Sequence, residues 1–281
     1  MLLNSLHIPT VCSIISPNHT TPNLRRFCSS THPHPPLLLR FRTSHRENIR
    51  YLKTLGIVSN NNRPPSQEFI DRILSLLNFL KSNGFSEADF RRLSSICPRL
   101  FSSGIDPTDI APVFDFLTDE LTASPDDSCG LILRCPGILF SDVEFCLRPT
   151  LLFLRGLGLE NLNLPTTLNA HLLNTRVERL IPKLRFLKSL GFSDEESAKV
   201  CVRLPAIFGY SIENNLGPKV EYLVKEMKRD VEELKLFPQY FAFSLKNRIV
   251  PRHLHLKERN VQVPLKRMLL WSDQRFYAKW K

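Results

Sequence analysis

Lysine and arginine recur at fixed places in this sequence, and this pattern is the one most able to do chemistry. Lys183, Lys219 and Arg252 each follow directly after a proline that recurs along the chain. A second set follows an aromatic or imidazole ring and a leucine, and its members are Lys53, Lys81, Arg155, Lys188 and Lys257. Equivalent positions of a repeated fold lie on one face, so each set predicts a stripe of positive charge. Such stripes can neutralise phosphates.

Each set of cations also has a structural explanation. A cation in the last turn of a helix complements the helix dipole without any ligand, which explains the second set equally well. A cation at a helix N-terminus is opposed by the dipole by about a few tenths of a kcal/mol, so the first set favours a phosphate bound there. Solubility alone could also account for these three cations. Arg134 and Arg203 form a sparser third set, for which capping of exposed carbonyls is the structural alternative.

The prolines before the first set belong to a phrase that returns along the chain. The spacings between them are 37, 33, 36 and 33 residues. A proline is tolerated in the first turn of a helix and is damaging deeper in it, so we predict that each one opens a helix. The copies are "IAPVFDFL" at 110–117, "LRPTLLFL" at 147–154, "LIPKLRFL" at 180–187, "LGPKVEYL" at 216–223 and "IVPRHLHL" at 249–256, with a proline-free copy "ILSLLNFL" at 73–80.

A second phrase follows the first and predicts a second helix in each unit. Its copies are "SSICPRLFS", "LRCPGILFS", "VRLPAIFGYS" and "KLFPQYFAFS", whose prolines should end that helix. The copy between 160 and 178 lacks this proline. In the turn "SLGFSDEES", Ser193 and Glu196 have the spacing of a capping box. The sequence therefore predicts an all-α superhelical solenoid of about six two-helix repeats over residues 66–260.

The two ends of the chain differ from its middle. Residues 1–46 contain five Arg, many Ser, Thr and Pro, and no acid, which predicts an organelle transit peptide. Its prolines favour a chloroplast over a mitochondrion, which stays as the alternative. Residues 47–65 read as a truncated repeat followed by the flexible break "NNNRPP". Residues 47–245 are nearly neutral, with a net charge of −2.

The C-terminal tail, residues 246–281, carries ten Lys or Arg against two acids. Lys266 and Arg267 lie there among Trp and Phe residues. Such cations could bind a nucleic-acid backbone while the aromatic rings stack on bases. Equally, the rings could cover the last helix as an end cap, which a terminal repeat requires.

Several classes of function lack their usual motifs. The seven cysteines form no C-x-x-C pair and have no histidine at metal-ligand spacing, so we expect neither a zinc site nor a disulfide framework. Cys97, Cys135 and Cys201 fall in apolar helical patterns and should be buried. A P-loop, a G-x-G-x-x-G and an H-E-x-x-H are absent from the sequence, so we expect no enzyme and no cofactor. The apolar stretches are too interrupted to span a membrane.

The paired phrases "LxPxLxFLxxLG" and "LxxxPxLF" resemble those of the mitochondrial transcription termination factor family, mTERF. "IPKLRFLKSLGF" followed by "VCVRLPAIFGYS" is similar to one mTERF motif almost entire, and the likeness covers roughly residues 66–245. The resemblance implies a short plant organellar member with a helical solenoid that binds nucleic acid. It implies a role in organelle transcription, its termination, or RNA maturation. The aromatic residues of the first phrase occur at core spacing and should pack: Phe79, Phe116, Phe153 and Phe186.

We therefore expect a monomeric regulator of plastid gene expression that binds nucleic acid. Its partners would be double-stranded DNA or RNA of the organelle, or both, together with other proteins of organelle gene expression. The alternative is a protein-binding helical-repeat scaffold in the same organelle. A solenoid's concave face also accepts a peptide or a helix, and the near-neutral middle of the chain favours this alternative.

Overall fold

The computed structural model describes residues 44–59, 65–102 and 104–281, which form helices and turns without a strand. The predicted transit peptide lies outside the described residues up to position 43, as does the break at 60–64. The first described helix, α1 (His45–Thr54), begins at Ser44, whose hydroxyl accepts a hydrogen bond from the Glu47 amide. Within the described part, no helix is both long and apolar enough to cross a membrane.

The helices after α1 alternate as first and second helices of successive repeats. Some first helices contain a wider π-helical stretch. The label η marks both these π-helical stretches and the 3₁₀ helices. The first helices are α2 (Gln67–Ser82), α4 with η2 (Pro107–Asp115 and Phe116–Glu120), η4 with α6 (Val143–Leu147 and Arg148–Gly156), α8 (Val177–Ser189), η6, α10 and η7 (Ile212–Leu216, Gly217–Glu221 and Tyr222–Glu226), and η9 with α12 (Leu245–Ile249 and Val250–Glu258).

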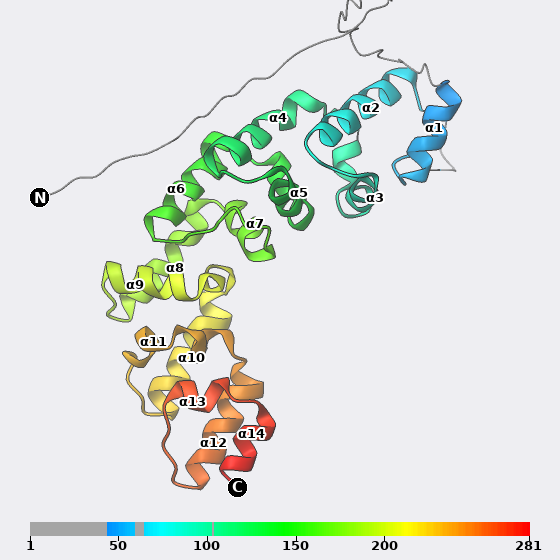
Figure 1. Cartoon of the computed structure of the whole chain (residues 1–281). Helices are drawn as coiled ribbons and strands as arrows, with labels where there is room; N and C mark the ends of the chain where they lie inside the picture. The colour runs from blue at the N-terminus through cyan, green and yellow to red at the C-terminus, as the bar shows by residue number, and fades with distance from the viewer. Residues whose placement is uncertain (1–43, 60–64, 103) are drawn as a thin grey trace, which may run out of the picture. The chain divides into compact units, whose positions relative to one another are not determined.

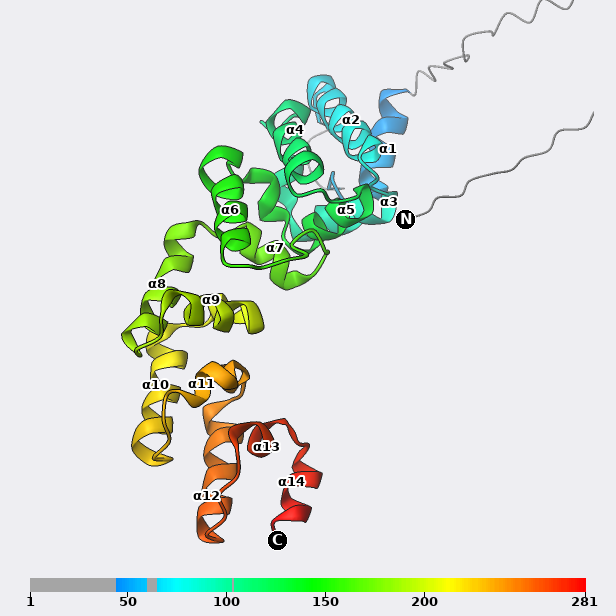
Figure 2. The ribbon, with the colours of Figure 1, turned by 60° about the vertical axis from the view of Figure 1, so that its left-hand side comes forward.

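The second helices are α3 (Glu87–Ile96), α5 (Pro125–Arg134), α7 (Thr167–Leu173), α9 (Asp194–Arg203), α11 (Glu233–Leu236) and α13 (Leu265–Leu270). A last helix, α14 (Asp273–Lys279), follows them. Neighbouring repeats contact each other through like helices, since α3 contacts α5 and α5 contacts α7, while α2 contacts α4 and α6 contacts α8 (Figures 1 and 2). One hydrophobic cluster runs from Leu52 to Phe276. The predicted all-α solenoid of two-helix repeats is thus confirmed.

The prolines of the second phrase end the second helices as predicted. The residue before each of them leaves the helical region, with φ between −136° and −143° and ψ between 62° and 77°. Each proline then begins a short 3₁₀ helix: η1 (Pro98–Phe101), η3 (Pro136–Phe140), η5 (Pro205–Gly209) and η8 (Pro238–Ala242). The capping box of Ser193 and Glu196 is also present at the start of α9.

The prediction that the first-phrase prolines open their helices is wrong for Pro112 and Pro182, whereas the other three prolines do stand in the first turn of α6, α10 and α12. Pro112 and Pro182 lie inside α4 and α8. Pro149, Pro218 and Pro251 come two residues after a π-helical turn that is continuous with the α-helix. In each of these three turns an amide bonds the carbonyl five residues earlier, which widens the helix ahead of the proline ring. A wider turn relieves the clash that an interior proline otherwise makes.

The interior position of Pro182 predicts the effect of replacing it. Pro182→Ala should raise the free energy of unfolding by about 1 kcal/mol or more, because alanine restores the missing N–H and is the better helix former. Pro205→Ala is the matched control. Pro205 begins η5 after the helix has ended, so its loss should lower stability by about 0.4–1 kcal/mol through a freer unfolded chain. Urea unfolding measures both. A destabilised Pro182→Ala variant would contradict the interior assignment.

Candidate nucleic-acid interface

Lys219, from the first predicted stripe, is buried and bound within the protein. Only 5% of its surface is exposed. Its ammonium donates to the Phe241 carbonyl at 2.6 Å and to the Asn215 side-chain oxygen at 2.7 Å. Burial lowers the pKa of this amine. Lys219 therefore ties the first helix of its repeat to the end of η8 and does not offer its charge to a ligand.

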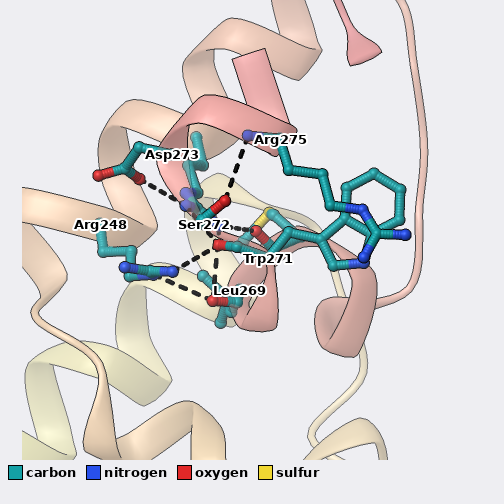
Figure 3. A network of polar contacts seen from close by, with 8 residues as sticks. Arg248, Leu269, Trp271, Ser272, Asp273 and Arg275 are labelled. Atoms are coloured by element: carbon teal, nitrogen blue, oxygen red, sulfur yellow. Dashed lines mark hydrogen bonds and ion pairs between the residues drawn. The ribbon is translucent and has the colours of Figure 1, made fainter. Parts of the chain in front are cut away.

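Arg252, from the same stripe, is also buried, with 1% of its surface exposed. Its guanidinium donates to the carbonyls of Met268 and Trp271, at 2.6 and 2.7 Å, and pairs with Asp273. That hydrogen bond holds the pKa of the Asp273 carboxyl below its usual range. Arg248, one turn earlier, donates to Leu269 and to the same Trp271 carbonyl, as Figure 3 shows.

These contacts correct the first stripe and give it a structural role. In the third repeat the residue after the proline is Thr150, also buried, and its hydroxyl donates to the Thr175 carbonyl just beyond α7 at 2.8 Å. In the third, fifth and sixth repeats the position after the proline therefore carries a donor for a carbonyl at or beyond the end of the second helix, and we call it the clamp position; the second repeat has Val113 there. Lys219 and Arg252 are clamps, and the expectation that they lie exposed at a helix N-terminus is wrong.

Lys183 holds the clamp position of the fourth repeat and behaves differently. It is half-buried and forms no hydrogen bond or ion pair with a described residue. Arg179 lies one turn before it, where Arg248 lies relative to Arg252, and Arg176 is the N-cap residue directly before α8. Both arginines are exposed and their side chains form no hydrogen bond or ion pair with a described residue. The fourth repeat thus keeps cations available at positions that the sixth uses internally.

Arg176 and Arg179 were not found from the sequence because the search followed only the positions after recurring prolines and rings. A signal for Arg179 was present. It stands four residues before Lys183, as Arg248 stands four residues before Arg252. Residues four apart are neighbours on one helix face.

The second stripe lies where predicted, in the last turn of the first helices. Lys53, Lys81, Arg155, Lys188 and Lys257 are all exposed there. Lys188 pairs with Asp194 at the start of α9, and Arg155 donates to the Glu120 carbonyl at 3.0 Å. The acidic caps of the second helices thus offset part of this charge, and the favourable dipole geometry is present at every member.

The third set makes the capping contacts that were its structural alternative. Arg134 donates to the Gly130 carbonyl of its own helix at 2.9 Å. Arg203 reaches the next repeat and donates to the carbonyls of Lys235 and Leu236, at 2.9 and 2.7 Å. Both arginines are exposed, so their outer faces remain accessible while their donors are partly used.

The C-terminal tail closes the end of the repeats. Phe276 is fully buried beneath the Arg252 guanidinium, and the Trp271 and Trp280 rings stack with centroids 5.1 Å apart. The end-cap alternative therefore describes these three rings. Lys266 and Arg267 on α13 stay exposed and form no ion pair with a described residue.

The aromatic residues of the first phrase and the three cysteines predicted to be buried lie in or against the hydrophobic core. The phrase aromatics Phe79, Phe153 and Phe186 pack against the core and Phe116 lies within it, as predicted. Cys135 and Cys201 are buried, and Cys97 is partly buried against the same core. Burial raises the pKa of the Cys201 thiol to about 12, so the thiol stays protonated at neutral pH. Within the described ranges no cluster of His, Cys, Asp or Glu could hold a metal ion.

The model of the mTERF family matches residues 120–277, more than half of the chain. The chain belongs to the mTERF family. The mTERF match begins at the end of the second repeat's first helix and extends into α14, so it includes the clamps and the tail.

Curated relatives agree with this assignment. The chain is 35% identical over 98 residues to transcription termination factor MTERF2, chloroplastic, of Arabidopsis thaliana, a match to 35% of this chain and 15% of the relative. It is 28% identical over 97 residues to MTERF4, chloroplastic, of the same plant, covering 34% of this chain and 18% of the relative. The chain is 35% identical over 89 residues to Arabidopsis MTERF8, chloroplastic, a match to 31% of this chain and 18% of the relative.

Each match spans less than a fifth of the relative. All three relatives are named as chloroplastic, which supports the chloroplast localisation predicted from the leader.

The clamp role of Arg252 predicts a large loss of stability on its removal. Arg252→Ala should lower the free energy of unfolding by about 3 kcal/mol, because buried carbonyls lose their charged donor. Lys257→Ala, an exposed cation on the same helix, is the control and should change stability by less than about 0.5 kcal/mol. Thermal or urea unfolding measures both variants. Unchanged stability of Arg252→Ala together with lost nucleic-acid binding would restore the phosphate-binding role.

Proposed function

We propose that this mTERF protein binds nucleic acid in the chloroplast and regulates gene expression there, in transcription, its termination, or transcript maturation. Family membership supports the general role, and the relatives are named transcription termination factors. The protein acts as a binder and has no catalytic step. Its partner is organellar DNA, RNA or both.

The observation that carries the proposal is the row of cations on α8. Arg179 and Lys183 are four residues apart on α8, so they share a helix face, and Arg176 is the N-cap residue directly before that helix. In the sixth repeat the equivalents of the last two are held by backbone carbonyls. No acceptor among the described residues bonds the side chains of the α8 row, and Lys183 acts on the Glu213 carboxyl only electrostatically, so the row's donors are available to phosphates.

Other exposed cations extend the proposed interface. Lys81 and Lys257 from the second stripe, and Lys266 and Arg267 from α13, form no ion pair with a described residue. The cations with internal partners contribute less, because a bonded guanidinium or ammonium has fewer donors to offer: Arg155, Lys188, Arg134 and Arg203. Lys219 and Arg252 are left out of the interface because they are buried.

Salt dependence tests this function on residues 43–281. Affinity for chloroplast transcripts or promoter DNA, measured by fluorescence anisotropy, should fall at least about tenfold between about 50 and 200 mM salt, because bound phosphates release counterions. The double variant Arg179→Ala, Lys183→Ala should bind about tenfold more weakly and show a salt slope smaller by about one to two.

The control removes the same charge from other places. Arg185 is exposed on a different face of α8, and Lys199 pairs with Glu195 on α9. The double variant Arg185→Ala, Lys199→Ala should bind within about twofold of the wild type, since neither residue belongs to the row. Equal losses in the two double variants would indicate a diffuse charge effect. Salt-insensitive binding, or none, would favour the protein-binding scaffold.

A further inference from the structure

The first helix of the third repeat exposes two large apolar side chains on one face. Phe145 in η4 is 78% exposed and Leu152 in α6 is 62% exposed. They are seven residues apart, two turns along one continuous helix, with Arg148 between them at helical spacing. Together, Phe145 and Leu152 form an apolar pair that no described residue covers.

The other repeats provide an internal comparison for this pair. Phe145 stands four residues before the repeat proline and Leu152 three residues after it. At the same two places the other repeats have Thr108 and Asp115, Glu178 and Arg185, Asn214 and Glu221, and Asn247 and Leu254. Leu254 is the one apolar side chain among these eight. Both places are therefore polar in the second, fourth and fifth repeats and one is polar in the sixth, whereas the third repeat is apolar at both.

The surface beside the apolar pair is strongly acidic. A hollow of about 560 Å³ lies between the first helices of the second and third repeats. Arg148 lies in its wall, and its guanidinium donates three hydrogen bonds to Glu120, of 2.6 and 3.0 Å to Oε1 and of 2.8 Å to Oε2, and pairs with Glu144. Six carboxylates line the hollow: Asp109, Asp115, Asp119, Glu120, Asp142 and Glu144.

We propose that this face docks a basic amphipathic helix of a protein partner. The partner's apolar residues cover Phe145 and Leu152, and its Lys or Arg residues meet the carboxylates of the neighbouring hollow. An apolar stripe at helical spacing is the usual seat of an amphipathic helix. The excess of carboxylates disfavours phosphate and selects a cationic partner. The surface is made of residues other than the α8 row and goes beyond nucleic-acid binding.

Peptide binding to the full chain tests the proposal. The probes are two fluorescent model helices of about four turns, one built from Leu and Lys and one from Leu and Glu in the same pattern. The Leu–Lys peptide should bind at least tenfold more tightly than the Leu–Glu peptide. The double variant Phe145→Ser, Leu152→Ser should weaken the Leu–Lys peptide at least tenfold. Both changes are on the surface, so thermal unfolding should confirm an intact fold.

Leu254→Ser is the matched control, because Leu254 is 47% exposed at the place equivalent to Leu152. It should leave peptide affinity within twofold of the wild type. The proposal is overturned if the Leu–Lys peptide does not bind, if both peptides bind equally, or if Leu254→Ser weakens binding as much as the double variant.

Evidence for either of two other occupants of this face would also overturn the proposal. Self-association of the wild type that the double variant abolishes, measured by sedimentation equilibrium, would assign the face to a second copy of the chain. Loss of nucleic-acid affinity in the double variant would assign it to nucleobases.

Discussion

Backbone carbonyls at or just beyond the ends of second helices need donors inside the protein, and this constraint ties together the helices of the third, fifth and sixth repeats. A helix end leaves its last carbonyls without intrahelical partners, and the stacking of repeats removes water from several of them. The clamp position of the first helix supplies the donor: the Thr150 hydroxyl, the Lys219 ammonium or the Arg252 guanidinium. A recurring proline directly precedes the clamp position in each of these three repeats.

This constraint determines which cations remain available to bind a ligand. A buried guanidinium held by carbonyls, as at Arg252, stabilises the fold and lies out of reach of a phosphate. A cation at the same place without a bonded acceptor, as at Lys183, acts on the Glu213 carboxyl only electrostatically and keeps its donors for a ligand. The same repeat position therefore serves structure in one unit and is proposed to serve recognition in another. The apolar pair of Phe145 and Leu152 shows the same division, since other repeats keep those places mostly polar.

The fold could be predicted from the sequence because it depends on local signals that repeat. The Pro205 phrase ends α9, and Ser193 with Glu196 begins it, as capping and proline geometry require. The role of Pro182 could not be predicted, because a proline in the first turn and one in the interior of a helix leave the same pattern of neighbours. The burial of Lys219 could not be predicted either, since it depends on the Phe241 carbonyl, 22 residues away in the chain. Charge alone does not reveal an acceptor.

The central claim is that the protein contacts nucleic acid in the chloroplast through the α8 row. Ultraviolet crosslinking in isolated chloroplasts, followed by purification of the protein and sequencing of the attached nucleic acid, tests this most directly. We expect defined chloroplast sequences to be recovered with the wild type and strongly reduced with Arg179→Ala, Lys183→Ala at equal protein abundance. Recovery at background level with the wild type, or equal recovery with both proteins, would contradict it.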